Sequence, residues 1–180
     1  MSHPIDGRDQ VILVDALDRE IGAQEKLAAH RAGALHRAIS VLVQRANGDV
    51  LLQRRASTKY HSQDLWTNTC CSHPRPGETT SAAASRRLQE EMGIGCTLRS
   101  VGRFTYRSTF DDGLIEHEID HVFIGMTDGA DPRPDPAEVG DWRWAPAPLV
   151  RWQSAVRPHW FTVWFPPVFD LATHRSARTL

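Results

Sequence analysis

The stretch GETTSAAASRRLQEEMG, residues 77–93, carries the clearest structural signal in this 180-residue sequence. An alanine-rich middle and a charged second half are typical of a helix. Thr79, Thr80 and Ser81 supply hydroxyls that can cap free backbone N–H groups where a helix begins, and Gly93 is typical of the residue just past a helix end. We therefore predict a helix from Thr79 to Met92.

Runs that favour β-strands lie on both sides of this helix. Residues 38–44 and 50–54 flank Ala46-Asn47-Gly48-Asp49, and Asn-Gly between two apolar runs is a strong hairpin signal. We predict further strands at 11–14, 101–108, 114–125 and 142–144, a proline-rich loop at 131–136, and two weaker helices near the carboxyl end. Strands before and after a helix, joined by hairpins, predict an α+β fold of mixed sheets flanked by helices.

The overall composition is that of one globular domain, with 41% hydrophobic and 24% charged residues. We predict a single domain over residues 1–180, with about the first ten residues flexible. A net charge of -1 gives no general attraction to nucleic acid or membrane, so neither is expected as a partner. Three cysteines and the lack of a secretion signal or long apolar run predict a soluble, cytoplasmic protein without disulfides. The oligomeric state stays open, with a monomer favoured.

The predicted helix also carries a charge pattern with chemical meaning. Arg87 and Glu91 share one helix face, which alone indicates only a weak surface ion pair. Glu78, however, stands eight residues before Arg86, and the loop 73–77 leads into the helix. Loop, glutamate and a helix with Arg…Glu-Glu…Gly together resemble the Nudix box, whose glutamates hold a divalent metal against a diphosphate.

Two positions differ from the usual Nudix box. Ser72 stands where its first glycine belongs, and Arg87 replaces the glutamate that follows Arg86. The second change removes a metal-binding carboxylate and adds a guanidinium that can hold phosphate oxygens with two parallel hydrogen bonds. Such a site should hold a diphosphate more readily than cut it.

A candidate metal site combines carboxylates and imidazoles. On a strand, Glu116 and Glu118 lie on one face and His117 on the other, so the two carboxylates repel unless a cation lies between them. The alternative is an exposed strand face with scattered charge. Three further imidazoles are available, on His30, His36 and His73. Three nitrogens and two oxygens suit a six-coordinate Mn²⁺ or Mg²⁺ better than Zn²⁺, which usually prefers four ligands.

Several motifs, in their order and spacing, resemble one family. They are EKLAAH (25–30), QRRASTK (53–59), WTNTCCSHP (66–74), the Arg87 variant of the box, and EHE (116–118). From about Val11 to Ala172 the chain resembles type I isopentenyl-diphosphate isomerases, metal-dependent members of the Nudix superfamily. The resemblance implies a Nudix-like fold with a metal-bearing pocket. It also implies interconversion of isopentenyl and dimethylallyl diphosphate, in isoprenoid biosynthesis, through a tertiary carbocation.

The resemblance also implies individual roles. Cys71 matches the catalytic thiol, Glu118 the second acid–base group and Tyr106 its neighbour, whereas Cys70 falls where the family tolerates other residues. The implied ligands of one Mn²⁺ or Mg²⁺, with Zn²⁺ less favoured, are His30, His36, His73, Glu116 and Glu118. Glu91 matches a ligand of a second Mg²⁺ that arrives with the diphosphate. The implied substrate contacts are Lys26, Arg55, Lys59 and Arg87 for the diphosphate and Trp164 for the hydrocarbon.

The chemistry of the two groups indicates a division of work. A thiol with an ordinary pKa near 8.5 is a feeble acid toward an alkene, so Glu118 is the more plausible proton donor, with Tyr106 relaying, and Cys71 the thiolate base. Two alternatives stay open. One is a Nudix hydrolase that cleaves a diphosphate, and the other is a structural zinc module built on Cys70, Cys71 and His73. Adjacent cysteines lack the spacing that lets two thiolates reach one zinc ion, which counts against the second.

Overall fold

Strand β3 (His36–Gln44) is the axis of a nine-stranded sheet in the computed structural model, which describes residues 10–127, 129 and 131–176. It pairs in parallel with β8 (Ile115–Met126) along one edge. Along its other edge it pairs antiparallel with β6 (Cys70–Ser72) and with β4 (Asp49–Arg55). Nearly every residue of β3 is buried, which agrees with its continuous apolar run and with a sheet covered on both faces.

The remaining strands extend the sheet on both sides. β7 (Leu98–Thr109) forms a long hairpin with β8, and β9 (Val139–Pro146) pairs with β4. β1 (Gln10–Val14) pairs with β2 (Glu20–Glu25) and touches β3, and β5 (Trp66–Thr67) pairs with β4. The predicted hairpins are confirmed, whereas β2, β5 and β6 were not predicted. The flexible segment predicted for the amino terminus lies in residues 1–9, outside the described residues, and Gln10 begins β1.

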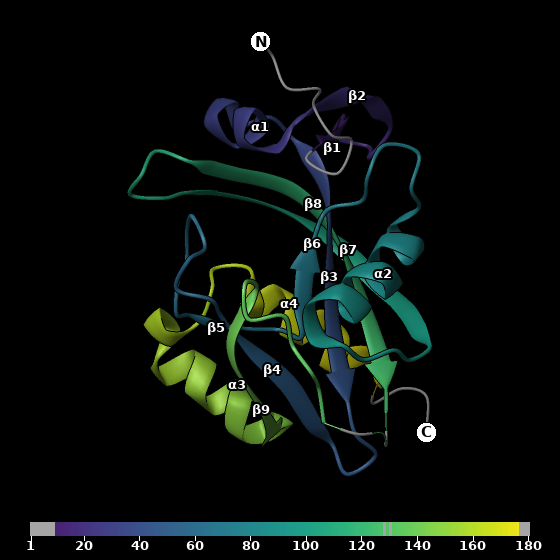
Figure 1. Ribbon diagram of the computed structural model, residues 1–180, viewed down its shortest axis with the longest axis vertical. Coiled ribbons are helices and arrows are strands. Elements are labelled where there is room, and N and C mark those ends of the chain that lie inside the picture. The colour runs from purple at the N-terminus through teal and green to yellow at the C-terminus, as the bar shows by residue number, and fades with distance from the viewer. Residues whose placement is uncertain (1–9, 128, 130, 177–180) are drawn as a thin grey trace.

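Helices cover both faces of this sheet (Figure 1). Ile39 and Val41 pack with Leu88 of α2 (Thr80–Met92) on one face, and Leu42 packs with Phe165 of α4 (Phe165–Ser176) on the other. Three shorter helices complete the chain: α1 (Lys26–Ala32), α3 (Ala147–Val156) and the 3-10 helix η2 (Pro158–Trp160). Across the described residues, none of the helices has the length and apolar character needed to cross a membrane.

The predicted helix is confirmed as α2, together with both of its caps. The Thr79 hydroxyl accepts a hydrogen bond from the Ala82 N–H at 3.2 Å, and Gly93 ends the helix with a φ of 65°. The carbonyl of Met92 accepts a hydrogen bond from the Arg133 N–H at 2.9 Å. The carboxyl end of α2 is therefore fastened to the proline-rich loop that leads toward β9.

Replacing Gly93 with alanine should destabilise the fold more than an ordinary turn substitution. The left-handed φ and a Cβ only 2.5 Å from the Arg133 carbonyl oxygen both act against alanine there. We expect Gly93→Ala to lower the free energy of unfolding by about 3 kcal/mol. Gly48→Ala is the control, because Gly48 has a φ of +88° and no atom within 4 Å of the added Cβ. It should cost about 1 kcal/mol in urea denaturation, and equal losses would contradict this account.

Candidate active site

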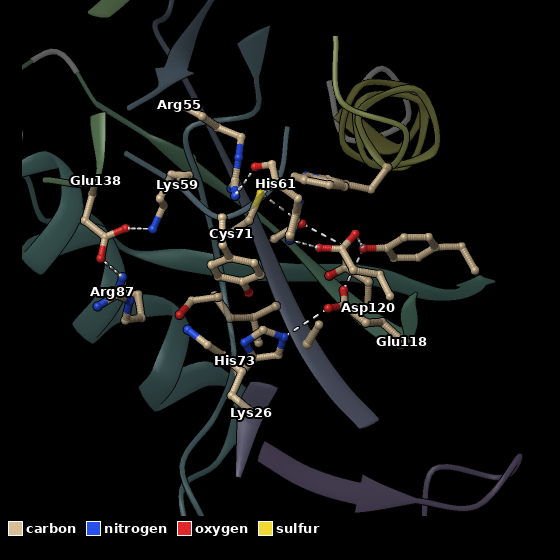
Figure 2. A pocket seen from close by; sticks show the side chains of 18 residues that line it. Lys26, Arg55, Lys59, His61, Cys71, His73, Arg87, Glu118, Asp120 and Glu138 are labelled. Carbon is tan, nitrogen blue, oxygen red and sulfur yellow. Dashed lines mark hydrogen bonds and ion pairs between the residues drawn. The ribbon is translucent and has the colours of Figure 1, made fainter. Parts of the chain in front are cut away.

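A pocket opens beside the first half of β3 and is lined by charged, aromatic and thiol side chains. Figure 2 shows Lys59 and Arg87 gathered at Glu138, with Glu118 and Asp120 across the pocket and Cys71 between the two groups. Most of the predicted site residues line it, namely Lys26, Arg55, Lys59, Cys71, His73, Arg87, Tyr106, Glu116, Glu118 and Trp164. The remaining three are buried nearby, with His30 and His36 beside His73 and Glu91 beside Arg87.

Three imidazoles and one carboxylate converge on one point. His30, His36, His73 and Glu118 each offer a ligand atom, and these atoms all lie within 4.8 Å of one another. They come from α1, the start of β3, the residue after β6, and β8. The Nε2 atoms of His73, His36 and His30 lie 3.0, 3.3 and 4.0 Å from Glu118 Oε1. His36 Nδ1 lies 2.8 Å from the Ala34 carbonyl, which fixes its ring and leaves Nε2 facing the cluster.

The chemistry of this cluster fits a divalent cation. Burial lowers the pKa of His30 to about 3 and that of His73 to about 4, so both rings are neutral and keep a lone pair for a metal. The Nε2 atom of His30 is buried and has no hydrogen-bond partner, and that of His36 faces Glu118 Oε1 at 3.3 Å. Burial would also raise the pKa of Glu118, but hydrogen bonds from His36 and His73 outweigh it and hold that pKa well below its ordinary value. Imidazole nitrogens around an ionised carboxylate form a suitable ligand set.

Glu116 does not join this group of four. Its Oε2 accepts a hydrogen bond from the Tyr106 hydroxyl at 2.9 Å, and its Oε1 lies 3.0 Å from His61 Nε2. The same hydroxyl lies 2.7 Å from Glu118 Oε2, so Tyr106 bridges the two carboxylates. The two glutamates share one strand face, as predicted, while His117 lies off the cluster, its Nδ1 being 3.1 Å from the Gly33 carbonyl.

The two adjacent cysteines point to opposite faces of the sheet. Cys70 is buried in the core beneath α2. Cys71 lies in the pocket, where its Sγ accepts the Trp164 Nε1–H at 3.1 Å and donates to Asn68 Oδ1 at 3.1 Å. Burial raises the pKa of Cys71 to about 12, so its sulfur is protonated at neutral pH in the substrate-free protein. Thiols on opposite faces cannot bind one ion, which rules against the zinc module.

Two of the predicted diphosphate contacts, Lys59 and Arg87, form ion pairs with carboxylates. Glu138 Oε2 pairs with Lys59, and Glu138 Oε1 lies 3.1 Å from Arg87 Nη2. Arg87 Nη2 also lies 2.6 Å from Oε1 of the buried Glu91. Arg55 donates to the His61 carbonyl at 3.2 Å, and the Lys26 ammonium lies 5.3 Å from the centre of the Tyr60 ring. All four cations line the same pocket.

Glu138 and His61 also line the pocket, and neither was predicted as a site residue. Glu138 follows the proline-rich loop and His61 stands two residues after Lys59, and neither belongs to a recognisable motif. The only available signal was their nearness to segments already implicated. Glu78 and Arg86, which the sequence places eight residues apart, are joined by a double hydrogen bond, with both N···O distances 2.7 Å.

Comparisons with known proteins agree with this picture. A NUDIX domain profile matches residues 34–164 of the chain. Isopentenyl-diphosphate Delta-isomerase 1 of Aromatoleum aromaticum is 51% identical over 173 residues, which is 95% of this chain and 97% of that protein. The Isopentenyl-diphosphate Delta-isomerase of Burkholderia multivorans is 52% identical over 157 residues, which is 87% of this chain and 89% of that protein.

Solved structures resemble the fold. DR0079 from Deinococcus radiodurans has a TM-score of 0.68 at 19% identity, covering 82% of this chain and 90% of that one. A MutT protein from Methanosarcina mazei Go1 has a TM-score of 0.64 at 18% identity, covering 81% and 96%. Likeness at such low identity concerns the fold alone. The predicted Nudix-like α+β fold is thereby confirmed.

Mn²⁺ should raise the melting temperature of the protein, because an ion held by the cluster binds only the folded state. At a hundred times its dissociation constant the ion adds about 2.7 kcal/mol to the free energy of unfolding. His73→Ala should abolish the rise in calorimetry, whereas His117→Ala, which changes an imidazole outside the cluster, should keep it. An undiminished rise in His73→Ala would show that the ion binds elsewhere.

Removing the charge of Glu138 should tighten binding of inorganic diphosphate. An incoming anion must compete with this carboxylate for Lys59 and Arg87, and such a partly exposed pair contributes up to about 1 kcal/mol, or about five-fold in affinity. We expect Glu138→Gln to show that gain in isothermal titration calorimetry with Mg²⁺ present. Glu90→Gln is the matched control, because Glu90 pairs with Arg87 Nη1 at 2.8 Å but does not line the pocket. Equal changes in the two variants would refute direct competition.

Proposed function

The chain belongs to the isopentenyl-diphosphate Delta-isomerase family, and on this premise we propose how its pocket interconverts isopentenyl and dimethylallyl diphosphate. A proton is added to the terminal methylene carbon, which leaves a tertiary carbocation at the branched carbon. A proton is then lost from the methylene carbon on the other side of the cation, and no bond to phosphorus breaks. The observation that carries the proposal is that β3 brings a buried thiol and a carboxylate into one pocket lined with phosphate-binding cations.

Glu118 is the proton donor toward isopentenyl diphosphate, and Tyr106 relays. The proximity of the Tyr106 hydroxyl to both Glu116 and Glu118 supports this assignment, because a phenol can pass a proton between two carboxylates while keeping one hydrogen bond to each. The hydrogen bonds that hold Glu118 ionised come from imidazole nitrogens. A metal ion bound by these nitrogens would take over that role, because an adjacent cation also favours the ionised carboxylate, and it would make a proton on Glu118 easier to give up to an alkene.

Cys71 is the base on the other side of the substrate. Its sulfur must lose its proton to act, and the Trp164 N–H supports the thiolate, as does the Ser40 hydroxyl at 3.7 Å from Sγ. One turnover moves a single proton equivalent across the site. It begins with protonated Glu118 and a Cys71 thiolate and ends with ionised Glu118 and a Cys71 thiol. The pKa shifts of the two groups correspond to the second state, in which Glu118 is ionised and Cys71 is a thiol. The reverse reaction starts from that state.

The pocket also has to protect a carbocation. Trp164 is only 3% exposed, and its indole borders both the thiol, with Nε1 3.1 Å from Cys71 Sγ, and one cation, with Arg55 5.4 Å from its ring centre. The π face of a desolvated indole can stabilise a cation by about 2 kcal/mol. Exclusion of water matters equally, since water would trap the cation as an alcohol.

We assign one Mn²⁺ or Mg²⁺, in preference to Zn²⁺, to His30, His36, His73 and Glu118, with Glu116 as the fifth ligand. When bound, this ion would supply positive charge that stabilises the ionised carboxylate of Glu118 and fixes its orientation. Glu91 would contribute to a second Mg²⁺ that accompanies the diphosphate. We further propose that the protein acts as a cytoplasmic, single-domain monomer without nucleic acid or membrane partners.

A hydrolase is the alternative for a chain with a NUDIX domain. The position after Arg86 argues against it, because Arg87 removes a metal-binding carboxylate and places a cation where the diphosphate binds. A thiol buried beside Trp164 has no task in cleavage of a diphosphate.

The decisive assay incubates the protein with isopentenyl diphosphate and Mg²⁺ or Mn²⁺ and follows dimethylallyl diphosphate and free phosphate. We expect isomer without phosphate release. Cys71→Ala should fold and bind metal but lose about 10³-fold in kcat, the usual range for an acid–base group. Cys70→Ala, its matched control, should stay active because Cys70 lies beneath α2 and does not line the pocket. Phosphate release without isomer would instead establish the hydrolase.

A further inference from the structure

His61 is the second imidazole, beside His73, that lines the pocket, and it does not belong to the cluster of ligand atoms. Its side chain is 4% exposed, and its ring stacks on Phe110 with centroids 4.4 Å apart and an interplanar angle of 15°. Its Nε2 lies 3.0 Å from Glu116 Oε1, and its Nδ1 lies 3.2 Å from the Ser62 hydroxyl. A buried ring bonded through both nitrogens and stacked on one face has a fixed orientation.

The two oxygens of Glu116 are engaged by different partners. Tyr106 donates to Oε2, and His61 is in place to donate to Oε1. A Ser62 hydroxyl that donates to Nδ1 leaves a ring proton on Nε2, which faces Glu116 Oε1. A buried carboxylate needs such donors, because an unpaired oxygen there is costly.

We propose that His61 is a positioning residue, whose Nε2–H fixes the carboxylate of Glu116 and, through Tyr106, the carboxyl group of Glu118. Short contacts join His61 to Glu116, Glu116 to the Tyr106 hydroxyl, and that hydroxyl to Glu118, with its single proton shared between the two carboxyl groups. Without the first of them, Glu116 can rotate and draw the Tyr106 hydroxyl away from Glu118. The inference rests on the function proposed above, in which Glu118 and Tyr106 handle the substrate proton.

The diphosphate side of the pocket should be insensitive to this imidazole. Arg55 Nη2 bonds to the main-chain carbonyl of His61 at 3.2 Å, which a side-chain substitution leaves in place. A change at His61 should therefore lower kcat and leave KM for isopentenyl diphosphate nearly unchanged. A merely structural role would lower the melting temperature without producing this split.

Two substitutions separate the hydrogen bond from the stacking. His61→Phe keeps an aromatic ring against Phe110 but has no donor for Glu116, whereas His61→Gln can place an amide N–H near the original Nε2 but cannot stack. We expect His61→Phe to lose about 10- to 100-fold in kcat and about ten-fold in Mn²⁺ affinity, the usual cost of removing a partner of a metal ligand. Its KM should stay within about two-fold. His61→Gln should keep most of both quantities.

Measurements of kcat, KM, the Mn²⁺ dissociation constant by electron paramagnetic resonance, and melting temperature decide between the two roles. An unchanged kcat and Mn²⁺ affinity in His61→Phe would overturn the proposal, and so would equal losses in both variants. Absence of isomerase activity in the wild type would instead refute the proposed function. The Mn²⁺ affinities of the two variants would then still test whether His61 holds Glu116.

Discussion

The pairing of β3 with β6 on one edge and β8 on the other is the constraint on which the site depends. In register, Ser40 stands opposite Cys71, and His36 stands opposite Glu118. Alternation along a strand then turns the thiol and the carboxylate toward the same face, while Cys70 and the odd-numbered residues of β3 pack beneath α2. A slip of one residue in either pairing would bury a catalytic group in the core, so the apolar faces that fix the register also fix the chemistry.

The protein has a net charge of only -1, but many of its charged side chains are concentrated around one pocket. Lys26, Arg55, Lys59 and Arg87 line the pocket together with the carboxylates of β8, and Lys59 and Arg87 lie across the pocket from Glu118 and Asp120 (Figure 2). Glu138 pairs with Lys59 and Arg87, and Glu91 pairs with Arg87. These ion pairs hold the two long cationic side chains in defined positions. In the mechanism that we propose, the hydrocarbon of the substrate lies against Trp164 and Cys71, away from its charged end.

The parts of the fold encoded by local sequence could be predicted, and those decided by distant pairing could not. The caps of α2 and the Gly48 turn are properties of a few neighbouring residues, and both were predicted correctly. β5 and β6 are short and exist because β3 and β4 offer them partners. His30, His36 and His73 were found through a family resemblance, and the structure brings them together. His61 and Glu138 act on partners distant in sequence, and a lone histidine or glutamate in a loop carries no periodic signal.

The division of work between Glu118 and Cys71 is tested most directly by hydrogen exchange in Cys71→Ala. With isopentenyl diphosphate in D₂O, Glu118 can still add a deuteron to the terminal methylene carbon, but no base remains to complete the isomerisation. Nuclear magnetic resonance should show deuterium entering the terminal methylene of recovered isopentenyl diphosphate, with no dimethylallyl diphosphate formed. Recovery of undeuterated substrate from a folded, metal-binding variant would contradict this account, because the thiol itself would then be required for protonation.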